Sequence, residues 1–317
     1  MTERDEPRAA TVAAAAPPLA ELEALAADRR RGAAEIADAL LEWCEAWGAE
    51  EADGSSFADP GEVAAALAEV ARFQAAMAPI LRISNDLLLE IERREDAGDE
   101  GSVRRAVGKT ARSWRQRLAA AAESLGLHLR RAFESASTIY TYSASSTVRS
   151  AIHAHYVAGN WFQVVLSEAR PGNEGAALAR DLADLGVPVR FGTEAWLWSA
   201  MEDEGVFVVG SDALLSMRWV NKVGTHALAE RARASGVPVV VAADTSKWLP
   251  PALASLPRNY DRDPAELVVR PPASMEVANP YFEEIPYTAL DQLITERGPT
   301  RPRDLRSSEI AVARALQ

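Results

Sequence analysis

Hydrophobic positions recur at every third or fourth residue from about residue 19 to residue 131, a spacing that predicts amphipathic helices. Clusters of Val, Ile and Thr, which favour strands, are nearly absent from this stretch. Breaks rich in Gly, Asp or Ser at 53–56 and 97–101 predict loops between the helices. We therefore expect a helical domain over residues 19–131. Residues 1–18 are rich in Ala, Pro and charge without a repeating apolar face, and we expect them to form a disordered tail.

From Phe133 onward the pattern changes to short β-rich runs that alternate with amphipathic segments. Two of these segments end in a similar turn, in which Gly follows a helix and Pro begins a strand (185–188 and 235–238). The alternation predicts an α/β domain over 132–317, with a doubly wound, mainly parallel sheet covered by helices on both faces. The expected strands are 138–142, 163–167, 187–191, 206–210 and 237–242, and the expected helices are 148–157, 175–185, 194–202 and 224–234.

Ligands of doubly wound sheets bind beyond the carboxyl ends of the strands, so the residues that follow each strand are candidates for a site. They are small, polar or charged, and we expect them to meet at one rim. Alternatively, they only cap the helices that follow, as polar residues do in any such fold. The candidates are Ser143, Ser145, Ser146 and Thr147 after the first strand, Glu168 and Arg170 after the second, Thr193 and Glu194 after the third, Ser211 and Asp212 after the fourth, and Asp244, Thr245, Ser246 and Lys247 after the fifth.

The hydroxyl-rich segment 143–147 suits an anion, because the free amides and the dipole of a helix N-terminus favour negative charge. Alternatively, Ser145 or Ser146 is a simple N-cap. The segment does not belong to a known phosphate-binding motif, since no GxGxxG follows a strand and no GxxxxGK[ST] occurs in the chain. No GxSxG nucleophile elbow occurs either, which removes support for serine hydrolase chemistry of that type.

Three charged residues have a more specific interpretation. Asp212 follows a buried strand, where burial raises a carboxyl pKa toward the range useful for acid–base chemistry, although it could instead cap the next helix. Lys222 is expected to open the following helix, a position that is unfavourable for a cation unless an anion binds there. Lysine is scarce, with Lys109, Lys222 and Lys247 as the full set, which favours a ligand-binding role for Lys222. Arg170 either clamps a phosphate or forms a structural salt bridge.

Composition narrows the function classes. Hydrophobic residues make up 48% and charged residues 25% of the 317 positions, as in globular proteins, and the net charge of −12 disfavours nucleic acid as a partner. Cys44 is the single cysteine, so no internal disulfide is expected. We expect no membrane-spanning helix, no secretory signal and a cytoplasmic location, because no apolar run approaches 18 residues and the N-terminus is acidic. His153 and His155 lie two apart and cannot share a helix face, so no metal site is expected, nor any cofactor.

Six segments in this order resemble one known family. It unites the alpha, beta and delta subunits of eukaryotic initiation factor 2B with methylthioribose-1-phosphate isomerase and archaeal ribose-1,5-bisphosphate isomerase. The resemblance covers nearly all of the chain after residue 18. The segments are Thr141-Tyr-Ser-Ala-Ser-Ser-Thr-Val, Ser167-Glu-Ala-Arg-Pro-Gly-Asn-Glu-Gly, Val209-Gly-Ser-Asp-Ala, Val220-Asn-Lys-Val-Gly-Thr, Ala242-Ala-Asp-Thr-Ser-Lys and Asn279-Pro-Tyr-Phe-Glu-Glu-Ile-Pro.

The resemblance implies a helical N-terminal domain packed on a Rossmann-like C-terminal domain, usually dimerised through the latter. The isomerases of the family hold an aldose 1-phosphate between the domains and shift a proton between C1 and C2, using a cysteine after the first strand and an aspartate after the fourth. Asp212 matches that aspartate. Asn221 and Lys222 match a ligand-contacting Asn-Lys pair, and Arg31-Gly32-Ala33 looks like an element that touches the sugar phosphate.

Two positions depart from the isomerase pattern. Ser143 stands where the isomerases have the cysteine, and a serine hydroxyl is a poor base without an activating partner because its pKa is far above that of a thiol. Gln74 aligns with a second isomerase arginine, which weakens the case for a phosphate contact there. The initiation-factor subunits also carry a serine at the first position, and they generally keep a phosphate pocket without isomerising its contents.

Three hypotheses follow. The first is a protein that binds a phosphorylated sugar or nucleotide between its two domains, with the isomerase chemistry lost or altered. The second is an active aldose–ketose sugar-phosphate isomerase in which Asp212 carries the proton and Ser143 only donates a hydrogen bond. The third is a regulatory subunit acting in translation initiation. In each case the resemblance implies a homodimer, and the sequence leaves open whether it assembles further.

Overall fold

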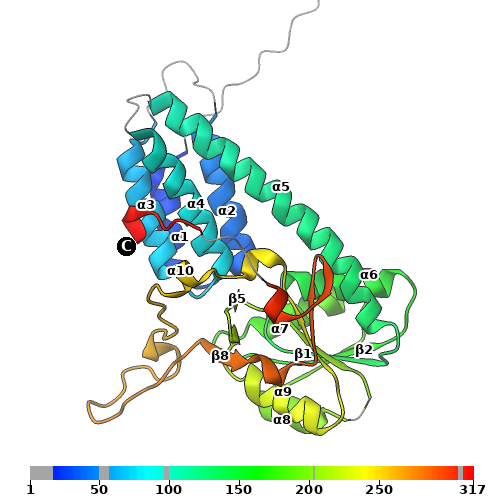
Figure 1. Cartoon of the computed structure of the whole chain (residues 1–317). Coiled ribbons are helices and arrows are strands. Elements are labelled where there is room, and N and C mark those ends of the chain that lie inside the picture. Colours follow the sequence, from blue (N-terminus) through cyan, green and yellow to red (C-terminus); the bar gives the residue numbers. More distant parts are fainter. Residues whose placement is uncertain (1–16, 50–56, 96–99, 203, 306–309) are drawn as a thin grey trace, which may run out of the picture.

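The computed structural model describes residues 17–49, 57–95, 100–202, 204–305 and 310–317, which form a helical lobe and a sheet lobe (Figure 1). Residues 1–16 of the predicted tail and the predicted loop at 53–56 lie outside the described residues. Pro18, which we assigned to the tail, belongs to the fold: its carbonyl accepts a hydrogen bond from Trp43 Nε1 at 2.9 Å. The helices of this lobe are α1 (Leu19–Ala27), α2 (Ala33–Trp47), α3 (Pro60–Phe73), α4 (Ala78–Glu95) and α5 (Glu100–Phe133).

Local sequence signals account for where these helices begin. Asp59 and Glu62 form a capping box around the first turn of α3, with Pro60 at its first position. Glu35 similarly reaches back to the amide of Gly32 at the start of α2. Residues 97–99 of the predicted loop at 97–101 lie outside the described residues, and Glu100 and Gly101 already belong to α5. Apolar faces of the five helices then share one buried core, with Leu22, Ile36, Leu40, Leu67, Ile80 and Leu88 at its centre.

Helix α5 joins the two lobes. It is 34 residues long and runs from the top of the helical lobe down onto the sheet (Figure 1). Its first half contributes Val103, Val107 and Ala111 to the helical core. Its last turns contribute Leu125 and Phe133 to the core on the sheet. The domain boundary predicted at residue 131 therefore falls inside α5, just before its end.

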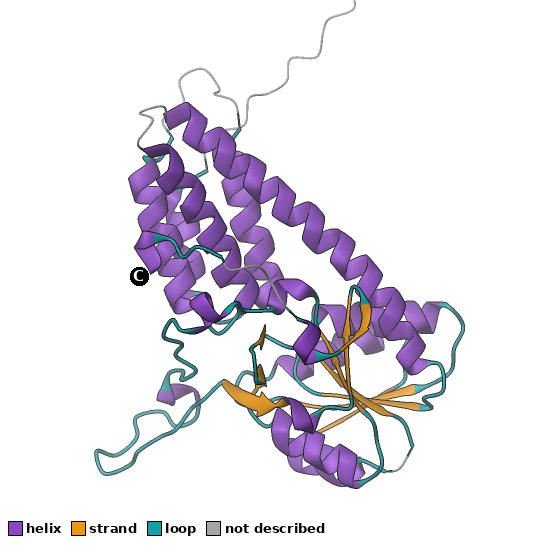
Figure 2. Ribbon diagram, viewed as in Figure 1, coloured by secondary structure: helices purple, strands orange, loops and turns teal. Residues whose placement is uncertain are grey.

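The main sheet has seven strands in the order β10-β9-β7-β4-β1-β2-β3, all parallel except β10. Figure 2 shows the strands in orange and the helices around them in purple. All five predicted strands occur in it, which confirms the doubly wound, mainly parallel fold. The edge strand β3 departs from the expectation of burial on both faces, since Arg190 and Phe191 are exposed. The bounds are β1 (Thr138–Thr141), β2 (Gln163–Ser167), β3 (Val189–Gly192), β4 (Val206–Val209), β7 (Val239–Ala242), β9 (Gln292–Thr295) and β10 (Gly298–Thr300).

Helices cover both faces of the main sheet. Because side chains alternate along a strand, Phe207 and Val209 enter one core while Val206 and Val208 enter the other. The first core also contains Leu197 of α8 and Leu228 of α9, and the second contains Ile152 of α6 and Leu182 of α7. The helices are α6 (Ser146–Val157), α7 (Glu174–Asp184), α8 (Glu194–Ala200), α9 (Thr225–Ala234) and α10 (Pro251–Ala254).

A second, antiparallel sheet was not predicted. It consists of β5 (Ala213–Leu214), β6 (Arg218–Lys222) and β8 (Phe282–Pro286), in that order. Asn221 and Lys222 lie in β6, so the expectation that they open a helix was wrong. The helix α9 begins after them, at Thr225, behind the left-handed Gly224. This sheet lies where the two lobes meet, since Ala213 and Val220 pack into the helical core.

The C-terminal residues return to the helical lobe. Asn85 of α4 donates a hydrogen bond to the carbonyl of Ala311 at 3.1 Å and accepts one from the amide of Ala313 at 2.9 Å. Ala313 and Leu316 are buried in the helical core. The helical core thus contains residues from both ends of the described chain.

Candidate functional site

The loops that follow β1 and β4 touch each other at the carboxyl end of the sheet. Ser143, directly after β1, has a φ of 62°, a left-handed conformation that is strained for a non-glycine residue. Gly210, directly after β4, approaches the first loop so closely that an added Cβ would lie 2.8 Å from Ser145 Oγ. Glycine is therefore required at position 210 for the two loops to meet. Ser143 and Asp212 consequently belong to adjacent loops at this rim.

Main-chain hydrogen bonds from both lobes hold Asp212. Its amide donates to the carbonyl of Val220 at 2.8 Å, and its carbonyl accepts from the amide of Ala78, at the start of α4, at 2.9 Å. Burial raises the pKa of the Asp212 carboxyl to about 6, although the positive charges of Lys247 and Lys222 oppose the rise, and the negative charge of Glu174 adds to it. A carboxyl group with this pKa exchanges a proton readily near neutral pH.

Lys222 is almost completely buried, with 2% of its surface exposed. Its Nζ donates to Oε1 of Glu174 at 2.9 Å and lies 3.6 Å from the centre of the Tyr281 ring. Burial lowers the pKa of Lys222, and the carboxylate of Glu174 opposes that effect. Lys222 thus has an anionic partner within the folded chain. We call the group formed by Ser143, Glu174, Asp212 and Lys222 the strand-end site.

Side chains around the strand-end site fix the backbone after β6. Asn221 donates from Nδ2 to the hydroxyl of Thr225 at 3.1 Å, and that hydroxyl donates to the carbonyl of Lys222. The hydroxyl of Tyr142 donates to the carbonyl of Val223 at 2.7 Å. The Asn221 amide therefore orients the turn before α9.

The remaining rim candidates divide between caps and open positions. Ser145 caps α6 by accepting from the amide of Val148 at 3.3 Å, the alternative we had left open, and Ser146 is exposed in its first turn. Arg170 is exposed, and its side chain forms no ion pair within the described ranges, so the expected salt bridge does not occur there. Its amide instead donates to the carboxylate of Glu194 at 2.9 Å.

The segment after β7 connects the strand-end site to the helical lobe. Arg82 of α4 donates to the carbonyl of Thr245 at 2.7 Å and to that of Trp248 at 3.2 Å. Lys247 lies between these two residues, at the end of a 3₁₀ turn that Asp244 caps. Its charge is close enough to lower the pKa of Asp212. The charge of Lys247 therefore acts on the strand-end site, in agreement with its position after the fifth predicted strand.

The N-terminal candidates occupy structural positions. Arg31 is exposed and forms an ion pair with Asp28 at 2.6 Å, while Gly32 is the N-cap of α2 and Ala33 is its first residue. Gln74 is buried, and its Nε2 donates to the carbonyls of Leu25, Ala26 and Asp28. The amide group of Gln74 thus holds the C-terminal end of α1, and its hydrogens are not available to a phosphate.

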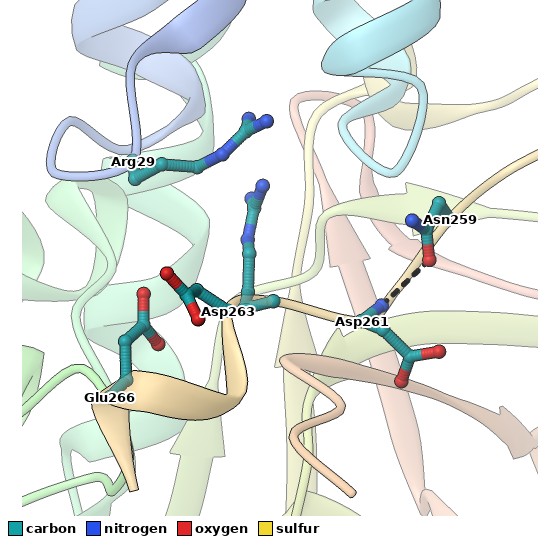
Figure 3. A pocket seen from close by; sticks show the side chains of 6 residues that line it. Arg29, Asn259, Asp261, Asp263 and Glu266 are labelled. Carbon is teal, nitrogen blue, oxygen red and sulfur yellow. Dashed lines mark hydrogen bonds between the residues drawn. The ribbon is translucent and has the colours of Figure 1, made fainter. Parts of the chain in front are cut away.

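An open recess of about 370 Å³ lies beside the strand-end site (Figure 3). Arg29 reaches into it from the loop after α1, opposite residues of the segment between α10 and β8. Arg262 of that segment lies 5.2 Å from the centre of the Tyr281 ring, the same ring that Lys222 contacts. We call this group the arginine recess, and its lining residues are Arg29, Asn259, Asp261, Arg262, Asp263 and Glu266.

Sequence reasoning missed Glu174, Tyr281 and Arg262. Glu174 and Tyr281 both lie in segments that we quoted for the family resemblance, but their meeting depends on long-range folding. A Cβ added at Gly172 would lie 2.3 Å from Glu174 Oε1 and 2.7 Å from the Tyr281 hydroxyl, which shows how tightly these residues pack. Within the described part of the chain, His, Cys, Asp and Glu side chains do not gather into a set able to hold a metal ion.

Residues 61–302 match the Initiation factor 2 subunit family. The chain belongs to that family. A ribose 1,5-bisphosphate isomerase of Haloferax volcanii is 30% identical over 282 residues, covering 87% of this chain and 86% of that protein. Three further archaeal proteins of the same name match over 59% to 65% of their own length.

Solved structures of this family share the fold. A Pyrococcus horikoshii translation initiation factor eIF-2B superimposes with a TM-score of 0.73 at 24% identity, covering 91% of this chain and 98% of that one. A 5-methylthioribose 1-phosphate isomerase from the same organism gives a TM-score of 0.69 at 20% identity, with coverage of 90% and 85%. Proteins with this fold thus carry names of both enzymes and initiation factors.

The described helices also bear on the expectation about membranes. None of them combines the length and the apolar character that a membrane-spanning segment requires.

Proposed function

We propose that this protein binds a phosphorylated sugar at the strand-end site, between the sheet lobe and the helical lobe. The observation that carries this proposal is the grouping of Asp212, which is held by hydrogen bonds from both lobes, with the buried cation Lys222. A cation supplies charge for a phosphate or a developing oxyanion, and the carboxyl group supplies hydrogen bonds to sugar hydroxyls. The 30% identity to a ribose 1,5-bisphosphate isomerase supports a sugar phosphate over a nucleotide.

Binding without turnover is the form of this proposal that the residue at position 143 favours. A serine hydroxyl does not lose its proton near neutral pH unless a base activates it. The described residues around Ser143 include no hydrogen-bonded base for its hydroxyl. The strained loop conformation of Ser143 is instead suited to presenting backbone amides and the hydroxyl to a ligand.

Aldose–ketose isomerisation is a second candidate, and the pKa of Asp212 favours it. With a pKa of about 6, the carboxylate is available as a base at neutral pH and, once protonated, returns the proton as an acid. In the direction from aldose 1-phosphate to ketose, Asp212 takes the proton from C2 as the bond between C1 and the ring oxygen breaks, and then delivers that proton to C1. The 2-hydroxyl loses its proton as C2 becomes a carbonyl and the ring oxygen gains one, so the reaction balances without an oxidant or reductant.

Proton NMR with ribose 1,5-bisphosphate in heavy water separates the two candidates. Binding alone predicts broadened or shifted sugar resonances with every carbon-bound proton retained. Isomerisation predicts ketose signals or exchange of a C1 or C2 proton, both lost in Asp212→Asn. Ser143→Cys then tests whether a thiol adds turnover to a protein that only binds. Sugar resonances unchanged at millimolar protein would refute both candidates for this ligand.

We also propose that the protein is a homodimer, as the family resemblance implied. Light scattering coupled to size-exclusion chromatography at micromolar concentration gives the mass directly. A mass near twice the 34.2 kDa of the chain supports the proposal, and a monomer refutes it.

A further inference from the structure

The two arginines of the arginine recess lack ionic partners. Arg29 is exposed, and its guanidinium has a single hydrogen bond, to the carbonyl of Ala26 at 3.4 Å. Arg262 has a buried Nε without a hydrogen-bond acceptor among the described residues, and neither arginine forms an ion pair with them. Burial lowers the pKa of Arg262, and so does the positive charge of Arg29, while Tyr281 and the carboxylates of Glu266 and Glu174 oppose these effects. Two like charges therefore face each other across an open space.

The acidic residues of the recess are engaged elsewhere or point outward. Asp263 caps the turn at Pro264–Glu266 by accepting from the amide of Ala265 at 2.8 Å. Glu266 accepts from Nδ2 of Asn279 at 3.1 Å. Asp261 is exposed, and Figure 3 shows its carboxylate directed away from Arg29. These carboxylates lower the net charge of the recess without occupying the space between the two guanidinium groups.

We infer that Arg29 and Arg262 together bind a phosphate monoester in the arginine recess. A guanidinium donates from a planar fork that matches phosphate oxygens, and two of them facing one dianion turn their mutual repulsion into attraction. The buried Nε of Arg262 gains the acceptor that it lacks. Asn259, whose Nδ2 has no partner among the described residues, adds a neutral donor at the same edge.

The position of the recess suggests two sources for the phosphate group. Lys222 and Arg262 both lie against Tyr281, at 3.6 and 5.2 Å from its ring centre, so the arginine recess and the strand-end site adjoin at this ring. The first source is therefore a second phosphate of the sugar bound at the strand-end site, which rests on the function proposed above. The second source is a separate phosphorylated molecule that binds beside that sugar.

Binding at this position joins two segments that are far apart in the sequence. Arg29 belongs to the helical lobe, whereas Arg262 follows α10 in the segment that leads to β8. A phosphate held by both arginines therefore fixes the loop after α1 against the segment 259–266. This contact is partly exposed, so its strength decreases as salt is added.

Calorimetric titration of the full chain tests the inference with three probes: ribose 1,5-bisphosphate, ribose 1-phosphate and inorganic phosphate. The variants are Arg29→Ala, Arg262→Ala and the double variant. The matched controls are Arg30→Ala and Arg270→Ala, which remove one exposed arginine from each of the same two segments outside the recess. Circular dichroism and the thermal midpoint test whether Arg262→Ala is folded. If Arg262→Ala does not fold, Arg262→Lys replaces it, because lysine keeps the charge but lacks the planar guanidinium.

A second phosphate on the same sugar predicts that the variants bind the bisphosphate at least about tenfold more weakly. The affinity of the same variants for ribose 1-phosphate then stays within about twofold of the wild-type value. The two control variants bind every probe within about twofold of wild type. A separate phosphate predicts that inorganic phosphate binding is lost in the double variant while both sugars bind as before.

The outcomes also separate this inference from the proposed function. If neither sugar binds but inorganic phosphate binds in an arginine-dependent manner, the inference holds and the proposed function is wrong. If the sugars bind and none of the arginine variants changes any affinity, the inference is wrong and the proposed function stands. Absence of binding by all three probes to the wild-type chain overturns the inference.

Discussion

Lys222 and Arg262 lie against the same tyrosine ring, but only Lys222 has a carboxylate partner within the described chain. At the strand-end site, Lys222 is almost completely buried, and the carboxylate of Glu174 already neutralises its charge. In the arginine recess, Arg262 faces a second cation across open space. A ligand must compete with Glu174 to bind Lys222. In the arginine recess, it displaces no ion-pair partner of Arg29 or Arg262 within the described chain. The strand-end site is thus preorganised by the chain, and the arginine recess is left for a ligand to complete.

The largest expected effect concerns the buried ion pair between Lys222 and Glu174. Lys222→Met removes the partner of a carboxylate whose second oxygen, Oε2, is buried without a hydrogen bond. We expect a loss of about 2–4 kcal/mol in the free energy of unfolding, measured by urea denaturation at pH 7.5. The double variant Lys222→Met/Glu174→Gln should recover more than half of it. Equal stability of the single and double variants would show that the pair is not coupled.

The next effect concerns Asp212. Its pKa of about 6 in the folded chain lies above the value of about 3.9 for a free Asp, so ionisation costs stability as the pH rises between these values. Asp212→Asn is therefore expected to stabilise the chain by about 1–3 kcal/mol at pH 8 but by only about 0.5 kcal/mol or less at pH 4, where the folded state is protonated and the unfolded state is about half protonated. Urea denaturation at the two pH values measures this. The exposed Asp184→Asn serves as control, and a pH-independent change would contradict the prediction.

A smaller effect is expected from Glu174→Gln, which releases Lys222 from its internal partner. We expect the affinity for ribose 1,5-bisphosphate to rise by about three- to tenfold, because the ligand no longer competes with a carboxylate. Calorimetric titration measures the change, and Glu168→Gln, on the same loop, is the matched control. Weaker binding by Glu174→Gln would mean that the carboxylate itself contacts the ligand.

The smallest effect distinguishes Arg31 from its neighbour Arg29. Arg31 is exposed and paired with Asp28, so Arg31→Ala should change the unfolding free energy by less than about 0.5 kcal/mol. Its affinity for ribose 1,5-bisphosphate should stay within about twofold of wild type, unlike that of Arg29→Ala. A loss of affinity equal to that of Arg29→Ala would place the phosphate on Arg31, as the motif suggested.

Parts of the fold and of the candidate site could be predicted from local patterns in the sequence, and other parts could not. The strands β1, β2, β3, β4 and β7 and the position of Asp212 after β4 were predictable, because period and position after a strand are local properties. The strand β5 has two residues, too few for any periodic signal, and with it the second sheet escaped prediction. The pairing of Lys222 with Glu174 spans 48 positions and is visible only after folding. Arg31 was chosen from a three-residue motif, but the carboxylate of Asp28 draws its side chain away, and Arg29 lines the recess instead.

The contacts of Asn85 have a consequence for biosynthesis. Its side chain is bonded to residues 226 and 228 positions further along the chain, and Ala313 and Leu316 fill the core between α3 and α4. A ribosome emits a chain from its N-terminus, so helices α1 to α5 emerge long before the residues that complete their core. The nascent helical lobe must therefore wait, with part of its apolar interior uncovered, until residues 310–317 leave the exit tunnel.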